Sequence, residues 1–225
     1  DGPLKRYDPI RNAALKKIRT RFTPAELADV VNAYAEAGVK APDLFETVAS
    51  ALRERLASFK ADDACDVAFA LSRARCVSED LLNDVAAHAN TTATSAEALA
   101  RLCYAFARKG IKRGEGASTA ASNARRAVED GGTLSLDALS RCCWAAAALE
   151  GEDASVLFNE CTKRVARCAN EFSGKQLVTI AFAASKKRTV DTELFDAVAD
   201  GIADKTSELN PQGLSNAAFA YATVR

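Results

Sequence analysis

Seven cysteines and a single histidine, His88, are the side chains that could bind a metal ion or provide a nucleophile and its base. The cysteines are odd in number and lack the paired C-x-x-C spacing of zinc and redox sites, and His88 has no cysteine or acid paired with it. The sequence contains no G-x-x-x-x-G-K-[ST], H-E-x-x-H or G-x-S-x-G motif. We therefore expect a protein that is not an enzyme, with no metal site and no cofactor. The cysteines are Cys65, Cys76, Cys103, Cys142, Cys143, Cys161 and Cys168.

Most of these cysteines fall on the apolar faces of predicted helices, where a reduced thiol behaves as a small hydrophobic side chain. Free thiols are typical of a reducing compartment such as the cytosol, the mitochondrial matrix or the plastid stroma. No run of residues approaches the roughly 18 apolar positions that a membrane span needs, so we expect no membrane insertion. The N-terminus shows no signal peptide and is compatible with processing after organelle import.

Arginine and lysine side chains could provide a different chemistry, the neutralisation of RNA phosphates. The chain has 30 basic and 30 acidic residues, and this balance argues against strong nonspecific affinity for nucleic acid. The basic residues are nevertheless concentrated in the middle of the chain and in certain turns. An alternative interpretation is a solvated polar face with ordinary helix-end charges. The candidate RNA-binding residues are Arg73, Arg101, Arg108, Lys109, Lys112, Arg113, Arg141, Lys186, Lys187 and Arg188.

The most basic stretch is "LKRYDPIRNAALKKIRTRF", residues 4–22, in which Asp8 is the single acid. It is interpreted either as a terminal helix with solvated cations or as a basic arm that contacts RNA or an acidic partner. The residues of this possible basic arm are Lys5, Arg6, Arg11, Lys16, Lys17, Arg19 and Arg21.

A repeat positions the candidate residues. One leucine position recurs at spacings of 37, 35, 40, 38 and 37 residues, with alanine in one copy, and such a period is typical of a repeat array. An aromatic residue follows five positions later in five of six copies, and an alanine follows six positions later in all six. The leucine positions are Leu27, Ala64, Leu99, Leu139, Leu177 and Leu214; the aromatics are Phe69, Tyr104, Trp144, Phe182 and Phe219; the alanines are Ala33, Ala70, Ala105, Ala145, Ala183 and Ala220.

Each copy predicts two amphipathic helices. After Leu27, apolar residues follow at helical spacing, and a second stripe begins about 17 residues later. Because neither helix can bury its stripe alone, the pairs are expected to stack. We predict an all-α fold, an α-solenoid of about five two-helix repeats of 35–40 residues. A basic helix in 1–21 precedes the five hairpins of 22–208, and 209–225 form the first helix of a sixth, truncated repeat.

Two features of the repeat bear on function. The polar positions two and nine after the leucine are basic in the central copies, and the aromatics beside them either stack on bases or fill the core. Turns inside a copy are mostly basic, whereas turns between copies are mostly acidic, so one rim is expected to be positive and the other negative. The second helix of the third copy, within residues 110–132, lacks a leucine stripe and is bracketed by glycines, which predicts the weakest part of the stack.

The stretches "SAEALARLCYAFA", "SGKQLVTIAFAAS" and "NPQGLSNAAFAYA" carry a family resemblance. An "L-x-x-x-x-(aromatic)-A-x-A" helix with a period near 37 to 38 residues resembles the octotricopeptide and heptatricopeptide repeats, and the FAST-kinase-like helical repeats, of organellar RNA-binding proteins. The resemblance implies an α-solenoid of mitochondria or plastids that acts in RNA expression, processing or ribosome assembly, or that is a ribosomal constituent. Many such proteins end in a RAP domain, which this sequence lacks, so nuclease-like activity has no support.

The expected function is therefore noncatalytic binding of organellar rRNA or mRNA in RNA processing, ribosome assembly or an organellar ribonucleoprotein such as the mitoribosome. The mitochondrial matrix is favoured over the plastid stroma. The alternative is a protein scaffold or accessory subunit of a large organellar complex that does not bind RNA. The neutral charge balance favours the scaffold, and the resemblance together with the basic central helices favours RNA.

Overall fold

The computed structural model describes residues 8–188 and 191–224, and within these ranges every regular element is a helix. Short turns join the helices, and in three of them, Leu56–Ser58, Ala169–Glu171 and Thr206–Glu208, the described chain forms one turn of 3₁₀-helix. The α-helices of the described chain are α1 (Asp8–Ile18), α2 (Pro24–Glu36), α3 (Pro42–Arg55), α4 (Ala61–Arg73), α5 (Glu79–Thr91), α6 (Ala96–Lys109), α7 (Glu115–Glu129), α8 (Leu136–Ala148), α9 (Glu152–Arg167), α10 (Gly174–Lys187), α11 (Thr192–Asp204) and α12 (Pro211–Thr223).

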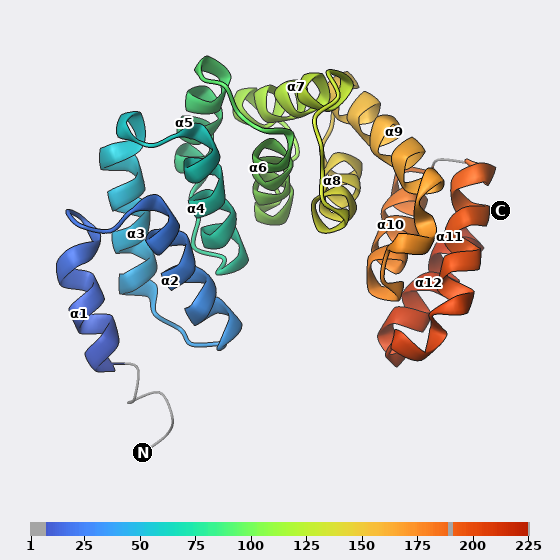
Figure 1. The fold of residues 1–225 in the computed structure, drawn as a ribbon, viewed down its shortest axis with the longest axis horizontal. Helices are drawn as coiled ribbons and strands as arrows, with labels where there is room; N and C mark the ends of the chain where they lie inside the picture. The colour runs from blue at the N-terminus through green and yellow to red at the C-terminus, as the bar shows by residue number, and fades with distance from the viewer. Residues whose placement is uncertain (1–7, 189–190, 225) are drawn as a thin grey trace.

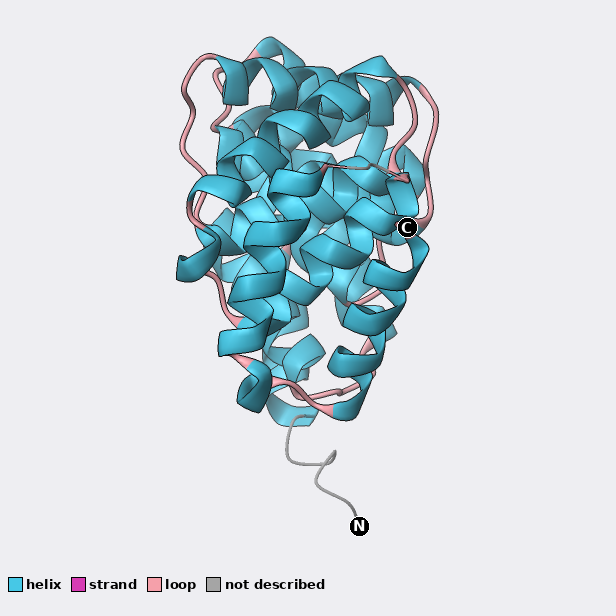
Figure 2. Cartoon of the chain, turned by 90° about the vertical axis from the view of Figure 1, so that its right-hand side faces the viewer, coloured by secondary structure: helices cyan, strands magenta, loops and turns pink. Residues whose placement is uncertain are grey.

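The helices form a curved, two-layered arch (Figure 1). On the concave side α2, α4, α6, α8, α10 and α12 pack one against the next, and α3, α5, α7, α9 and α11 cover the convex side. The view from the end shows turns along both edges of the layers (Figure 2). The prediction of an all-helical protein whose helices pack in series is therefore confirmed for the described residues.

Of the concave helices named above, all but α4 begin after a capping residue; α4 follows Lys60, which forms no side-chain cap. In each case the side chain of the cap accepts a hydrogen bond from the backbone N–H three residues later, which satisfies one of the free donors of the first turn. Gly38 and Gly110 follow α2 and α6 with φ angles of 65° and 87°, the left-handed conformation that suits glycine. The caps are Thr23, Ser95, Ser135, Ser173 and Asn210.

The repeated leucines and alanines lie in one continuous core, as their period predicts. Exceptions occur at the two ends of the concave layer. Leu214 on α12 is 42% exposed, because α12 is the last helix of the described chain. Ala33 on α2 is exposed, whereas its five counterparts are buried, because α2 is the first concave helix of the described chain. The small alanine side chain therefore lies at the contact with the preceding concave helix and lets the two helices approach closely.

Helix α7 replaces the missing leucine stripe with alanines. Ala117, Ala120, Ala121 and Ala124 are buried on one face of the helix. At Gly116 an added Cβ atom would clash with Oδ1 of Asn83 on α5 and lie 3.0 Å from the ring of Phe106 on α6, so the absence of a side chain lets α7 lie close to both helices. The third copy therefore has a packed second helix, although its small side chains bury less apolar area than leucines do.

The convex helices are fixed to the turns before their concave partners. Arg55 donates to the carbonyl oxygen of Phe22 at 2.9 Å, Arg164 to that of Gly132 at 2.8 Å, and Lys205 to that of Phe172 at 2.5 Å. His88 occupies the equivalent place in the second copy: its Nε2 lies 2.9 Å from the carbonyl oxygen of Phe59 and must carry the proton, since a carbonyl only accepts. The single histidine thus has a structural contact.

Candidate nucleic-acid interface

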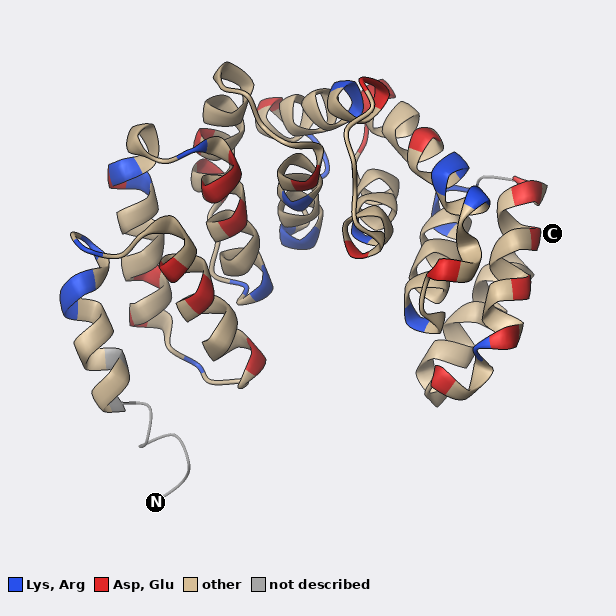
Figure 3. Cartoon of the chain, in the orientation of Figure 1, with Lys and Arg blue, Asp and Glu red and all other residues tan. Residues whose placement is uncertain are grey.

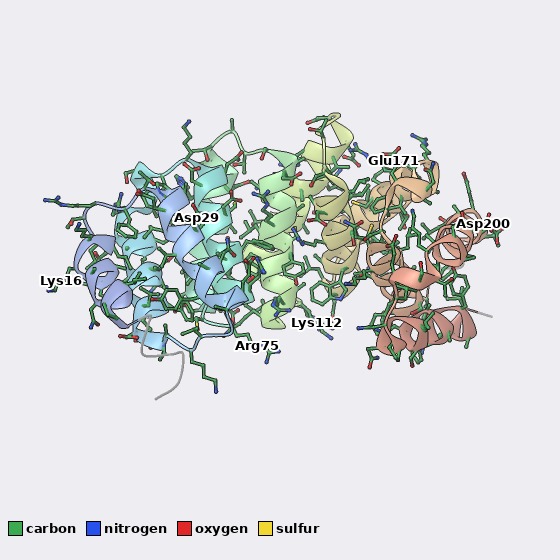
Figure 4. The ribbon with its side chains drawn as sticks, turned by 60° about the horizontal axis from the view of Figure 1, so that its bottom comes forward. Lys16, Asp29, Arg75, Lys112, Glu171 and Asp200 are labelled. Carbon is green, nitrogen blue, oxygen red and sulfur yellow. The ribbon has the colours of Figure 1, made fainter. Side chains whose placement is uncertain are left out.

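The two long edges of the arch differ in charge as the turns predict. Arg75 and Lys112 lie along one edge and Glu171 along the opposite edge, whereas Asp29 lies on the concave face of α2 (Figure 4). Acidic residues gather on α2 and α4, and basic residues at the lower ends of α4 and α6 (Figure 3). Each candidate cation must therefore be judged by the carboxylates that surround it.

Two of the candidate arginines are held by acids of the N-terminal half. Arg73 lies 3.4 Å from the carboxylate of Glu36 on the preceding concave helix. Arg101 donates to Asp66 at 2.5 Å and to Glu97 at 3.2 Å. Burial raises the pKa of Asp66 even though the Arg101 guanidinium opposes this effect. These arginines connect neighbouring concave helices, and their charge is largely compensated.

Arg113 and Arg141 are also paired. Arg113 forms an ion pair with Glu150 in the turn after α8. Arg141 lies 3.2 Å from Asp137, one helical turn earlier in α8, and its guanidinium lies 5.4 Å from the ring centroid of Phe69. A guanidinium over an aromatic face gains a cation–π attraction, so Arg141 is held in place on the concave surface.

The remaining cations of the central turns are not compensated. Arg108 and Lys109 at the end of α6, Lys112 in the turn that follows, and Arg188 after α10 have exposed side chains. None of these four side chains forms a hydrogen bond or an ion pair with another described residue. They form a basic edge that is free to neutralise phosphates.

The two lysines at the end of α10 differ from each other. Lys186 is exposed, and its ammonium group lies 5.1 Å from the ring centroid of Phe182 and 5.3 Å from that of Phe219. Lys187 is half-buried, and burial lowers its pKa. Lys186 is therefore the better placed of the two for an anionic ligand.

The aromatic residues of successive copies lie beside one another on the concave helices. The ring centroids of Phe69 and Tyr104 are 5.4 Å apart, and those of Tyr104 and Trp144 are 5.2 Å apart. Phe182 and Phe219 form a second pair at 5.9 Å. Tyr104, Trp144 and Phe182 are only half-buried. One part of each ring packs against the protein and another part is accessible, so core packing and base stacking do not exclude each other.

A cavity of about 430 Å³ opens on the concave surface between α6, α8 and α10. It combines an aromatic wall with cations, one carboxylate and uncharged polar groups. Sequence analysis missed Lys175, because it considered the turns and the positions two and nine after the leucine, whereas Lys175 stands two positions before Leu177. The lining residues are Tyr104, Arg108, Asp137, Ser140, Arg141, Trp144, Lys175, Gln176 and Thr179.

The same missed position carries acids in earlier copies, and these acids connect the concave helices. Asp62 accepts a hydrogen bond from the backbone N–H of Ser95, and Glu97 accepts one from the backbone N–H of Ser135, both at 2.9 Å. Asp137 accepts from Gln176 Nε2 at 2.6 Å. The position two residues before the leucine thus holds the next copy through an acid at Asp62, Glu97 and Asp137, and it presents a cation at Lys175.

A second concave cavity, of about 290 Å³, lies between α2, α4 and α6 and has the opposite character. Asp29, Asp63 and Asp66 line it together with Arg101 and Arg141. The N-terminal half of the concave surface is thus acidic and its arginines are paired, whereas unpaired cations are found from α6 onward.

The possible basic arm is only partly described. Lys5 and Arg6 lie outside the described residues, and the side chain of Arg11 is likewise outside the description. On α1 and in the turn after it, the remaining cations are exposed, and Arg19 lies 3.9 Å from Glu54 of α3. These exposed cations are Lys16, Lys17, Arg19 and Arg21.

The thiols lie where the apolar pattern places them. All seven cysteines are free; Cys76 and Cys168 are half-buried and the other five are buried. Burial raises the pKa of Cys103 to about 12, so its thiol is uncharged at neutral pH.

Within the described ranges, no group of histidine, cysteine and acidic side chains could hold a metal ion. The described helices also include none long and apolar enough to cross a membrane.

These features define an all-α helical-repeat protein with a concave surface that is acidic at one end and basic and aromatic toward the other. No protein-family model matches the chain, and no curated protein matches it either.

Proposed function

We propose that this chain is a noncatalytic RNA-binding helical-repeat protein that binds single-stranded RNA along the concave surface of α6, α8 and α10. One observation carries the proposal: Arg108 and Lys175 have no carboxylate partner among the described residues and line one cavity with the half-exposed rings of Tyr104 and Trp144. Lys112, in the turn after α6, is likewise unpaired among the described residues. Single-stranded RNA is bound by such combinations, because cations neutralise its phosphates and aromatic rings stack on its bases.

The charge distribution limits the proposed path. Asp29 and Asp63 on α2 and α4 have no basic partner at hydrogen-bonding distance among the described residues and would repel a phosphate backbone. The strand is therefore proposed to begin at α6 and to continue toward α10 and Lys186. Such a short path accounts for RNA binding by a chain with no net charge.

The finer assignment extends the sequence resemblance. We infer five two-helix repeats in residues 22–208, of the octotricopeptide or heptatricopeptide kind, flanked by one further helix on each side. The proposed location is an organelle, with the mitochondrial matrix preferred to the plastid stroma. There the protein would act in RNA processing or ribosome assembly, or as a constituent of an organellar ribonucleoprotein. Support for these points comes from the period and the motif alone.

A salt titration tests the proposal. The affinity for a fluorescein-labelled twelve-nucleotide oligouridylate, followed by fluorescence anisotropy, is expected to fall as KCl rises from about 50 to about 200 mM. Reversing two unpaired cations together, Arg108→Glu and Lys112→Glu, is expected to raise Kd at least about tenfold, since each charged contact contributes roughly 1.5 kcal/mol or more. The matched control reverses Arg126 and Arg167, exposed arginines of the convex helices α7 and α9, and should leave Kd within about twofold.

An absence of salt-dependent binding by the unmodified protein, or equal losses from both double variants, would refute the RNA proposal at this surface.

A protein scaffold is the second candidate, and the ion pairs of the concave surface favour it. Arg73, Arg101, Arg113 and Arg141 are each compensated by an acid, and the pairs of Arg73 and Arg101 join neighbouring concave helices, so these arginines are less available to phosphates. Cross-linking in the native source distinguishes the candidates: recovery of protein neighbours without RNA would favour the scaffold.

A further inference from the structure

A hydroxyl without a hydrogen-bond partner among the described residues lines the cavity between α6, α8 and α10. Ser140 is only 4% exposed and lines this cavity, yet its hydroxyl forms no hydrogen bond with any described residue. The comparable buried serines of other concave helices are satisfied internally: Ser72 donates to the carbonyl oxygen of Phe69 at 2.7 Å, and Ser185 to that of Phe182 at 2.8 Å. Because it lines the cavity and bonds to no described residue, the Ser140 hydroxyl is available to a ligand.

An aromatic surface and two cations surround this hydroxyl. Tyr104 on α6 and Trp144 on α8 form the aromatic wall. Arg108 lines the cavity from α6 and Lys175 from α10, on opposite sides of α8 (Figure 1). A ligand with an aromatic ring and an anionic group on either side of it would contact the aromatic wall, both cations and the hydroxyl.

We propose that this cavity binds one nucleotide of a single-stranded RNA. The base stacks on Trp144 and bonds to the Ser140 hydroxyl, and its flanking phosphates contact Arg108 and Lys175. This assignment rests on the proposed function and adds to it the position of one base along the strand.

The acid in the cavity does not oppose this ligand. Asp137 accepts a hydrogen bond from Gln176 at 2.6 Å and lies 3.2 Å from the guanidinium of Arg141, so its charge is already compensated. Thr179 donates its hydroxyl hydrogen to the carbonyl oxygen of Lys175 and is satisfied. The side chains of Ser140, Arg108 and Lys175, the groups assigned to the base and its phosphates, have no hydrogen-bond or ion-pair partner among the described residues.

A free mononucleotide presents the same chemistry, and the position of the cations favours a strand. Arg108 stands near the C-terminal end of α6, whereas Lys175 stands in the first turn of α10. Two cations at opposite ends of the cavity suit phosphates on both sides of one base, whereas 5′-UMP carries its phosphate on one side only.

Trp144 provides a direct reporter because it is the single tryptophan of the chain. Titration of the full chain with the twelve-nucleotide oligouridylate is expected to quench the Trp144 fluorescence, with a Kd equal to that from anisotropy, and 5′-UMP is expected to quench only at concentrations at least about a hundredfold higher. Lys175→Glu and Ser140→Ala retain the reporter. Lys175→Glu is expected to raise Kd about tenfold, and Ser140→Ala severalfold without loss of thermal stability, because this hydroxyl makes no bond within the described protein.

The outcomes separate the two proposals. RNA binding without quenching of Trp144, and with unchanged affinity in Lys175→Glu, would overturn the cavity assignment and leave the proposed function intact. An absence of binding by anisotropy would overturn both. Quenching by 5′-UMP at the same concentration as the oligonucleotide would overturn the proposal that the ligand is an RNA strand and would favour a mononucleotide. Arg167→Glu is the matched control for charge, and it should change neither the quenching nor Kd.

Discussion

Replacement of Arg101 by alanine should destabilise the fold, whereas replacement of Arg108 in the same helix should not. Arg101 donates to Asp66 on α4 at 2.5 Å and to Glu97 at 3.2 Å, with 30% of its side chain exposed. Arg108 is exposed and has no hydrogen bond or ion pair among the described residues. The pair therefore separates an arginine that connects two helices from one that is free for a ligand.

The expected loss of stability follows from these contacts. The pair of Arg101 and Glu97 is an i,i+4 pair worth about 0.3 to 0.5 kcal/mol. The contact with Asp66 joins two helices, and a charged hydrogen bond there contributes about 1 kcal/mol after allowance for the 40% exposure of the Asp66 side chain. We expect Arg101→Ala to lower the free energy of unfolding by about 1.5 kcal/mol, and Arg108→Ala to change it by less than about 0.5 kcal/mol.

The pH dependence gives a second, independent reading. Burial already raises the pKa of Asp66, and without Arg101 nothing opposes that effect. In the variant Asp66 thus takes up a proton at a higher pH than in the unmodified protein, so the loss of stability should shrink as pH falls from about 7 to about 4.5. Urea denaturation followed by circular dichroism, carried out on both proteins at both pH values, measures this loss of stability. A loss below about 0.5 kcal/mol at neutral pH, or one that grows on acidification, would refute the reasoning.

Three further predictions concern packing and titration. Gly132→Ala should lower the free energy of unfolding in urea by about 1 to 3 kcal/mol, because a Cβ atom there would lie 2.7 Å from the Cβ atom of Ala96, the first residue of α6. Thr133→Ala, at an exposed position, should be neutral. Native alkylation with iodoacetamide should modify Cys76 and Cys168 before the five buried cysteines, and an equal rate for all seven in mass spectrometry would contradict their burial. Burial raises the pKa of Tyr221 to about 12, so its contribution to stability should be complete below pH about 10 and lost as pH rises through about 12. A titration of the tyrosinate ultraviolet absorbance in which Tyr221 ionises at an ordinary tyrosine pKa would contradict this.

The periodic pattern was sufficient for the fold. The leucine position and the alanine six residues later are determined by burial within a helix and against its neighbour, and both are properties of local spacing. Thus Leu99 and Ala105 are buried as predicted. The exposure of Ala33 follows from its place on the first concave helix and could have been expected from the order of copies.

The charges were less predictable, because the partners come from different copies. Arg101 lies 35 residues from Asp66 in the sequence, and Arg113 lies 37 residues from Glu150. Whether such pairs form depends on how far neighbouring helices are displaced relative to each other along their axes. The residue pattern within one repeat does not contain this information. The free hydroxyl of Ser140 has the same origin, since its surroundings are formed by three helices at once.

The central claim is that RNA contacts the concave aromatic residues of the middle copies. Ultraviolet cross-linking of the bound oligouridylate, followed by mass spectrometry of the cross-linked peptides, tests it most directly. We predict cross-links to Tyr104, Trp144 or Phe182 and none to peptides of the convex helices α5, α7 and α9. Cross-links confined to α1 or to the convex helices would contradict the claim, as would their absence.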